Sequence, residues 1–167
     1  MANVPAAEID VSEQLVRLLL TDQHPDLADL PLEQVANGWD NVIFRLGTDL
    51  TVRVPRRQQA AQLILNEQNW LPVFDNWVSV QIPVPLRVGE PTSYYPWWWS
   101  VCPWFGGRLA SEVSRAGRTG MAEELAGFLI ELHRPAPPDA PANPVRGVPL
   151  ATRHAAVLQR LESGVIP

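Results

Sequence analysis

The sequence predicts an α+β protein in which a five-stranded antiparallel sheet with one long helix precedes an all-helical segment. Short strand-like segments, bounded by glycine and proline, recur over residues 32–101. One long stretch among them has helical spacing instead. After Gly106-Gly107 the apolar residues recur only at helical spacing. The glycine pair is therefore expected to divide the chain into a sheet domain, 1–105, and a helical domain, 106–167.

The first elements are predicted from a cap and a turn. Asp10–Glu13 resembles a capping box, so a helix is expected over Ser12–Asp22. Leu32–Ala36 is the expected first strand. Asn41–Leu46 and Asp49–Val54 are expected to form a hairpin, because a glycine-threonine pair separates two strand-like runs.

The next segment predicts the long helix, over Arg56–Leu71, since Pro55 ends the preceding strand. Its expected buried stripe consists of Ala60, Leu63, Ile64, Glu67, Trp70 and Leu71. Two short strands are then expected, over Val84–Val88 and Trp97–Val101. The second is apolar on both faces, which is typical of a central strand.

The rest of the chain predicts helices and a linker. Leu109–Val113 is expected to form a short helix, and Thr119 to cap a longer one over Gly120–Arg134. Thr152–Ser163 predicts the last helix. The proline-rich segment 135–149 cannot form regular structure, and its P-x-x-P spacings fit either a linker or the ligand of an SH3-type adaptor partner.

Composition and charge exclude several functional classes. The 167 residues carry 13 basic and 18 acidic side chains, a net charge of −5, which argues against binding to nucleic acid or to a membrane surface. The single cysteine, Cys102, excludes an internal disulfide and a zinc site built on several thiolates. Neither a signal peptide nor a membrane span is recognised, so a reducing, cytoplasmic setting is expected.

A lone cation on the second hairpin strand is the first candidate for a binding site. Arg53 lies between Val52 and Val54, so it points to the face opposite to theirs. Glu67 follows 14 residues later on the predicted helix, within reach if the helix packs on the sheet. A carboxylate partner would hold the forked guanidinium ready for a phosphate. A purely structural ion pair explains the same spacing equally well.

Two further segments present backbone rather than side-chain groups. The turn Gly38–Asn41 could bring N–H groups close to an anion, although a plain turn explains a single glycine better. Trp98–Gly107 runs from a strand into a connector that contains proline and glycine. Such a connector can present N–H and C=O groups to a flat aromatic ligand, while the tryptophans themselves fit an aromatic core.

The residues that resemble catalytic groups do not form a catalytic set. His24-Pro-Asp26 matches the start of a kinase catalytic loop, but Pro31 stands where the loop asparagine should be. His133 ends an apolar helix, and Cys102 has no nearby His or Lys in the sequence to activate it. No catalytic residue and no metal ligand is therefore assigned.

Six segments in the same order resemble the aminoglycoside phosphotransferase family of small-molecule kinases. They are GWDNVIFRLGTDLTVRVPRR, NEQNWLPVF, PVPLRVGEP, YPWWWSVCPWFGGRLAS, LAGFLIELHRPAP and RGVPLATRHAAVLQRL. The resemblance covers nearly the whole chain. It implies a protein-kinase-like N-lobe, an antiparallel five-stranded sheet plus helix, followed by the first helices of a truncated helical C-lobe.

The resemblance also implies a nucleotide site for ATP. Arg53 would replace the strand lysine that contacts the phosphates, with Glu67 as its helix partner. Gly38, Asp40 and Asn41 would belong to the phosphate-covering turn. The adenine-contacting hinge would comprise Ser100, Val101, Cys102 and Trp104.

The family's catalytic half has no counterpart in these residues. Members carry a His-x-Asp…Asn loop and a magnesium-binding Asp, whereas Asp139 is the only Asp after Asp75 and the sequence ends at Pro167. The expected function is thus that of an N-terminal fragment of such a kinase, inactive by itself. The full-length form would use ATP with Mg²⁺ to phosphorylate a small-molecule hydroxyl.

A non-catalytic role is the alternative. The truncated lobe would then bind a nucleotide or a protein without turnover. The apolar stripes of Gly120–Arg134 and Thr152–Ser163 would lack the cover of later helices, so self-association through them is expected.

Overall fold

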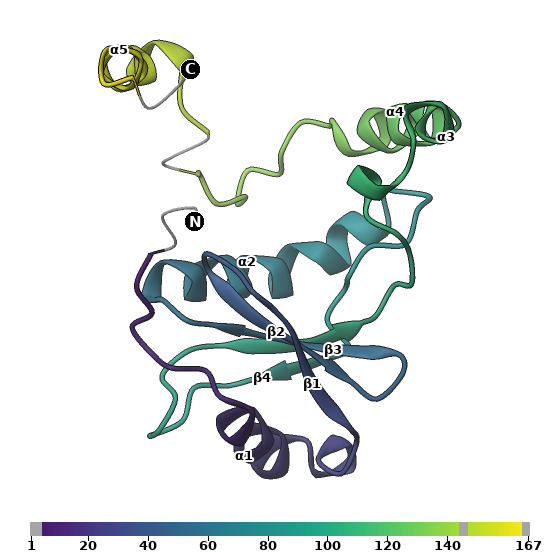
Figure 1. Ribbon diagram of the computed structural model, residues 1–167, viewed down its shortest axis with the longest axis vertical. Coiled ribbons are helices and arrows are strands. Elements are labelled where there is room, and N and C mark those ends of the chain that lie inside the picture. The colour runs from purple at the N-terminus through teal and green to yellow at the C-terminus, as the bar shows by residue number, and fades with distance from the viewer. Residues whose placement is uncertain (1–4, 144–146, 165–167) are drawn as a thin grey trace. The chain divides into compact units, whose positions relative to one another are not determined.

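The computed structural model describes residues 5–143 and 147–164 (Figure 1). The chain separates into two compact units, Met1–Arg134 and Pro135–Pro167. The predicted functional division at residues 105 and 106 lies inside the first of these units and stays a prediction.

The first unit is built on an antiparallel sheet of five strands, as the sequence predicts. The strands are β1 (Leu32–Asn37), β2 (Asn41–Leu46), β3 (Leu50–Pro55), β4 (Arg87–Gly89) and β5 (Trp99–Pro103). Their order across the sheet is β1-β2-β3-β5-β4, so β3 and β5 are central neighbours. The β2–β3 turn requires its glycine, because Gly47 has a φ of 60°, in the left-handed region.

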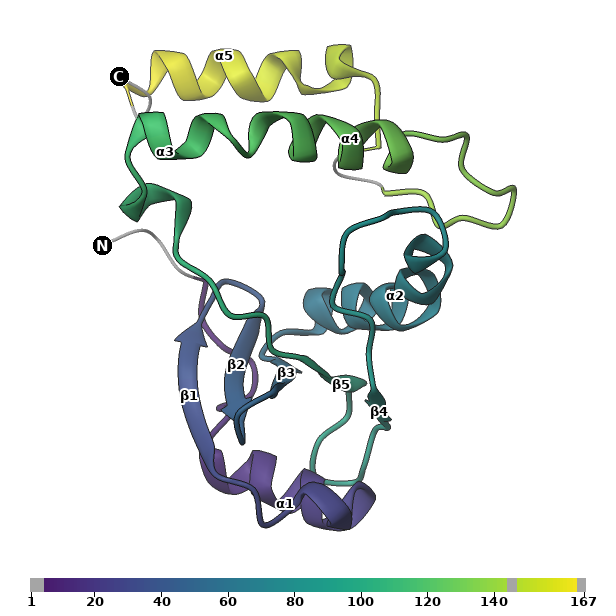
Figure 2. The ribbon, with the colours of Figure 1, turned by 90° about the vertical axis from the view of Figure 1, so that its right-hand side faces the viewer.

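Helix α1 (Glu13–Gln23) packs on the face of the sheet that points away from α2 in Figure 2. The apolar side chains of α1 and of this face form the buried core. Its N-cap is Ser12, whose hydroxyl accepts a hydrogen bond from the N–H of Leu15. The predicted capping box was therefore placed two residues too early, at Asp10. The buried apolar cluster comprises Val11, Val16, Leu19, Leu20, Val42, Phe44, Leu46, Val52, Val54, Tyr95, Trp99 and Val101.

Helix α2 (Gln58–Asp75) contacts β3 and β5 and runs beyond Pro72. Pro72 lies in the last turn of the helix, and the side-chain amide of Asn76 donates to its carbonyl at 2.7 Å. Ala60 and Ile64 are fully buried, as expected. The predicted stripe is wrong at Leu63, which is 43% exposed.

The strands after α2 differ from their predicted bounds. β4 is shorter than Val84–Val88 and begins only at Arg87. Pro83 and Pro85 precede it, and proline has no N–H to give to a ladder. β5 is displaced by two residues from Trp97–Val101, because it is Trp99 that pairs with Gly89.

Beyond β5 the first unit ends in short helices, which carry exposed apolar side chains. A 3-10 turn, Ala110–Glu112, is followed by α3 (Arg115–Thr119) and α4 (Ala122–Leu132). Thr119 ends α3 and does not cap the next helix, contrary to prediction; Ser114 caps α3, accepting from the N–H of Gly117. The second unit contains a 3-10 turn, Leu150–Arg153, and α5 (His154–Glu162). Across the described ranges 5–143 and 147–164, we find no helix with the length and apolarity of a membrane span.

Candidate functional site

The sheet has one polar face, which we call the α2 face because α2 covers part of it. Side chains alternate along each strand, so Arg53 and Thr51 share this face while Val52 lies on the other. The strand register places Ile43 and Ser100 on either side of Arg53. The register therefore assigns each candidate phosphate-binding or hinge residue on β2, β3 and β5 to one face of the sheet.

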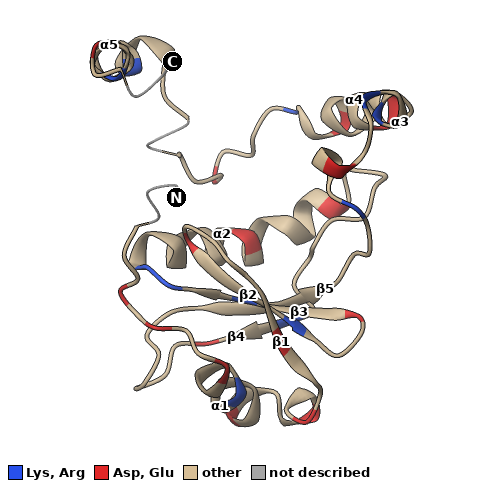
Figure 3. Ribbon diagram, viewed as in Figure 1, with Lys and Arg blue, Asp and Glu red and all other residues tan. Residues whose placement is uncertain are grey.

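Arg53 and Glu67 meet on the α2 face, as the spacing predicts. Arg53 Nη2 donates to Glu67 Oε1 at 2.9 Å, and the side chains are 24% and 33% exposed. Glu67 and Asp75 are the only charged residues of α2, which is otherwise uncharged along its length (Figure 3). Burial raises the pKa of Glu67, although the Arg53 charge opposes the rise. The pair is thus partly desolvated, in contrast to an ordinary surface ion pair.

Cys102 lies on the same face and is sensitive to the same charges. Its register partner on β3 is Thr51, two residues from Arg53. Burial raises the pKa of the Cys102 thiol to about 11, with a lowering effect from Arg53 and a raising effect from Glu67. The thiol therefore stays protonated at neutral pH and is a poor nucleophile.

Among the described residues, five buried side-chain atoms have no hydrogen-bond partner, and three of them lie on the α2 face; the other two are Arg56 Nε and Trp99 Nε1. Asn41 Oδ1, Arg45 Nε and Arg53 Nε are buried and make no hydrogen bond among the described residues. The three residues share a face, because the register opposes Asn41, Ile43 and Arg45 to Pro55, Arg53 and Thr51. Buried polar groups normally have partners, so such a group of orphans indicates a ligand or water site.

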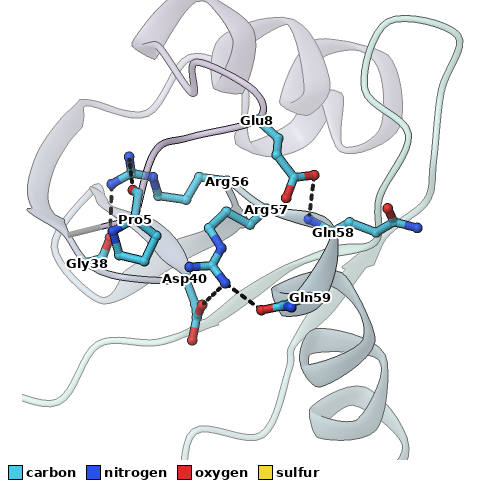
Figure 4. Close-up of polar contacts among 8 residues, drawn as sticks. All are labelled: Pro5, Glu8, Gly38, Asp40, Arg56, Arg57, Gln58 and Gln59. Atoms are coloured by element: carbon cyan, nitrogen blue, oxygen red, sulfur yellow. Dashed lines mark hydrogen bonds and ion pairs between the residues drawn. The ribbon is translucent and has the colours of Figure 1, made fainter. Parts of the chain in front are cut away.

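The turn Gly38–Asn41 is held by its own hydrogen bonds. Gly38 N–H donates to the Asn41 carbonyl at 3.0 Å, and the Gly38 carbonyl accepts from Arg56 at 3.1 Å. Asp40 adds a side chain that faces Arg57, 3.9 Å away (Figure 4). If the turn binds an anion through its backbone, the N–H groups of Trp39 and Asp40 must do so, and that of Gly38 is already used.

The predicted hinge residues lie mostly inside the sheet. Ser100, Val101 and Cys102 are buried in β5, between β3 and β4. The Val101 carbonyl accepts from Leu86 N–H at 2.8 Å, and Trp104 N–H donates to Asp49 at 2.7 Å. On the side of β5 that faces away from β3, β4 and the residue before it pair with the backbone only as far as Val101. Pro103 is therefore the first residue of β5 beyond β4 whose carbonyl faces that side.

Two residues that the sequence analysis did not select complete this face. Arg45 lies with its guanidinium 4.9 Å from the centre of the Trp104 ring, a cation–π contact at the end of β5. Gln68 donates from Nε2 to the Trp99 carbonyl and to Ser100 Oγ, both at 2.9 Å, and so ties α2 to β5. Arg45 lies two residues after Ile43 in β2, and Gln68 follows Glu67 directly in α2. These positions could have indicated Arg45 and Gln68 as candidates.

The face does not contain a metal centre in the described part of the chain. Within residues 5–143 and 147–164, no three His, Cys, Asp or Glu side chains come together in a way that could hold a metal ion. We therefore assign no magnesium ligand and no metal-dependent step to these residues.

Comparisons with known proteins agree with this architecture. The model of the phosphotransferase enzyme family matches residues 31–161. Among solved structures, the GDP complex of wild-type aminoglycoside 2'-phosphotransferase-IIIa is similar at a TM-score of 0.73 and 20% identity, over 94% of this chain and 54% of that one. The GDP and kanamycin complex of APH(2")-IIia gives a TM-score of 0.67 at 23% identity, over 91% and 52%. The streptomycin–ATP complex of APH(2")-IIa gives 0.55 at 18%, over 77% and 42%.

These similarities concern the fold. The chain spans about half the length of these aminoglycoside phosphotransferase structures. A search of curated proteins gives no match. The matched fold is the kinase-like sheet and helices that the sequence predicts.

Proposed function

The chain belongs to the phosphotransferase enzyme family, and from this premise we propose that its α2 face binds a nucleoside triphosphate, ATP in preference to GTP. In the complete enzyme the γ-phosphate would pass to a hydroxyl of a small molecule. The kanamycin and streptomycin complexes of the structural neighbours support that class of acceptor. The non-catalytic alternative shares the nucleotide site and differs only in the absence of turnover.

The observation that carries this proposal is the set of unpaired polar atoms beside the Arg53–Glu67 pair. Asn41 Oδ1 and Arg53 Nε are buried and lack partners among the described residues, on the face where Glu67 fixes the guanidinium. Arginine keeps its charge and offers forked donors, so it suits phosphate oxygens. A nucleotide on this face would use polar groups that the protein itself leaves unpaired.

The preference for adenine follows from the end of β5. The Val101 carbonyl points toward β4, and by alternation the Pro103 carbonyl points to the same side, where β4 no longer covers it. Pro103 has no N–H, so its backbone can only accept. Adenine presents an amino donor on the edge where guanine presents a carbonyl acceptor. Within the predicted hinge, the proposed adenine contact is thus Pro103 and not Ser100, Val101 or Cys102, and Trp104 lies beside it, stacked on Arg45.

The described residues supply binding and orientation only. Arg53 would hold a phosphate and Glu67 would hold Arg53, but no base is positioned to take the proton of an acceptor hydroxyl. Magnesium, when supplied with ATP, would neutralise phosphate charge. No residue of the described chain is assigned to it.

Calorimetric titration of the 167-residue chain with ATP and GTP tests the proposal. ATP should bind at least about tenfold more tightly than GTP, the effect of one unsatisfied polar contact. Arg53→Gln should weaken ATP binding by about tenfold or more, since a charge-assisted bond is lost. Arg87→Gln is the matched control, because Arg87 lies on another strand of the sheet and pairs with Asp26 at 3.7 Å. Absence of heat with both nucleotides, or equal losses in the two variants, would refute the nucleotide site.

Self-association is a second proposal, supported by the exposed apolar side chains of α4. Leu125 and Ile130 are 57% and 77% exposed. A second copy of the chain could cover them. Sedimentation velocity across a hundredfold range of concentration should show a rise in mass, which Ile130→Glu should abolish; a constant monomer would contradict it.

A further inference from the structure

Two adjacent arginines at the end of β3 have opposite environments. Both follow the last residue of β3; the Arg57 guanidinium faces Asp40, whereas Arg56 contacts other residues of the same turn. The Arg56 guanidinium donates to Asn37 Oδ1 at 2.7 Å and to the carbonyls of Gly38 and Pro5 at 3.1 and 3.4 Å. Arg56 is thus a structural residue that fastens the glycine turn to the N-terminal segment (Figure 4).

Arg57, in contrast, is mostly buried and has no short bond to a carboxylate among the described residues. Its side chain is only 14% exposed. Among the described residues, Nη2 donates to the neutral amide of Gln59 at 2.6 Å, and the one carboxylate nearby, Asp40, is 3.9 Å away. That separation is beyond hydrogen-bonding distance. A guanidinium has five N–H donors and is costly to bury without an anion. The Arg57 guanidinium therefore has donors to offer to an additional anion.

The position of Arg57 along β3 indicates which anion. The hinge lies at the Leu50 end of the strand, where Leu50 pairs with Pro103. Arg53 comes next and Arg57 lies four residues further from the hinge, at the turn that contains Asp40. We propose that Arg57 binds the terminal phosphate of the nucleoside triphosphate, and that Asp40 occupies the guanidinium when no nucleotide is bound. This inference rests on the proposed nucleotide site and adds a second phosphate-binding residue to it.

The other charged groups around the site are already engaged. The Glu8 carboxylate accepts from the N–H of Gln58 at 3.1 Å, so it is engaged by the first N–H of α2. Asp40 is the exception, because its side chain is 41% exposed and has no short hydrogen bond to Arg57. A phosphate can therefore replace it on Arg57 at small cost.

The first test compares ATP, ADP and AMP on the whole chain by calorimetry. Arg57→Gln should weaken ATP by about tenfold, ADP by less and AMP hardly at all, because only ATP reaches the lost charge. Arg56→Gln is the matched control. It removes the same charge one residue away, from a guanidinium already bonded to three protein acceptors, so any loss should be equal for the three nucleotides. Equal losses for the three nucleotides in Arg57→Gln as well, or no loss, would overturn the inference.

The second test removes the competing carboxylate. Asp40→Asn should strengthen ATP binding by about threefold, since it removes a long, weak ion pair that competes for Arg57. The gain should vanish in an Arg57→Gln background. Asp49→Asn is the control, an exposed aspartate in the other turn of the same sheet. If Arg57→Gln does not fold, the comparison of Asp40→Asn with Asp49→Asn decides alone, and equal affinities refute the inference.

Failure of the inference and failure of the proposed function give different results. Wild-type chain that binds no nucleotide refutes both. Wild-type chain that binds ATP, loses it on Arg53→Gln and keeps it on Arg57→Gln refutes only the second phosphate contact.

Discussion

The two faces of the sheet are made by the same strands and differ in almost every other respect. On the α1 face, the side chains of Phe44, Val52 and Val101 are at most 1% exposed and form one apolar cluster with α1. On the α2 face, their immediate neighbours include Arg45, Arg53 and Cys102. Three buried polar side-chain atoms stay unpaired there among the described residues, against one, Trp99 Nε1, in the apolar cluster.

This contrast separates stability from binding at the level of single residues. Alternation allows each strand to place one residue in the core and the next in the site. The α1 face gains its free energy from burial of apolar surface, at about 25 cal/mol per Å². The α2 face gives up part of that gain, because a desolvated Arg53–Glu67 pair stabilises little by itself. Such a face is retained where a ligand uses it.

The largest expected effect is therefore on the α1 face. Phe44→Ala should lower the free energy of unfolding by about 3–5 kcal/mol, since it removes a fully buried aromatic ring. Ile43→Ala, one residue away on the α2 face, should cost about 1 kcal/mol because its side chain is only partly buried. Urea unfolding measures both, and ATP titration should show a loss only for Ile43→Ala. Similar stability losses at the two positions would contradict the division between the faces.

A substitution that adds volume tests the tightness of the same face. A Cβ on Gly89 would overlap the indole of Trp99, which is fully buried and cannot move aside. Gly89→Ala should therefore cost about 1–3 kcal/mol, as overpacking does. Gly106→Ala is the control, because no atom lies within 4 Å of its Cβ position. Thermal melting that lowers both variants equally would indicate a generic glycine effect instead of tight packing.

The two faces also differ in how far the sequence predicted them. The Arg53–Glu67 contact was predictable, because a strand and the helix that directly follows it leave few ways to pack. Arg57 was not predicted, because it follows the last residue of β3 and strand alternation does not fix its direction.

The hinge and the later helices were less predictable for physical reasons. Trp97–Pro103 is apolar on both faces, so alternation could not fix the start of β5, which pairing with Gly89 determines. Thr119 has the chemistry of an N-cap, yet its hydroxyl donates to the Arg115 carbonyl at 3.3 Å, four residues earlier in α3. Whether Ser100, Val101, Cys102 and Trp104 contact a nucleotide stays a prediction.

A smaller effect is expected where α2 is tied to the sheet. Gln68 donates two hydrogen bonds to β5, to the Trp99 carbonyl and to Ser100 Oγ. Gln68→Ala should lower the free energy of unfolding by about 1–2 kcal/mol, because buried acceptors lose their donor. Gln62→Ala on the same helix removes only an exposed bond to Asn66 and should change stability by less than about 0.5 kcal/mol. Chemical denaturation that ranks Gln62 above Gln68 would mean that α2 is held by other contacts.

The smallest effect is a pH dependence that reports how dry the α2 face is. Burial raises the pKa of Glu67 above its ordinary value of 4.5, against the opposing charge of Arg53. At a pH between 4.5 and the raised pKa, Glu67 is still protonated in the folded state but has lost its proton in the unfolded state. Wild-type stability should therefore fall, relative to Glu67→Gln, as the pH rises from 4.5 through the raised pKa, and the difference should be constant outside this window.

Removal of Arg53 should sharpen this pH dependence. The Arg53 charge lowers the pKa of Glu67, so in an Arg53→Met background the decline relative to the matching Glu67→Gln double variant should become larger and extend to higher pH. Urea unfolding at half-unit pH steps measures the four proteins. A difference that rises with pH in the wild type would mean that the ion pair outweighs desolvation. The α2 face would then owe stability to its charges, as the α1 face does to its apolar side chains, and the pair would need no ligand to explain it.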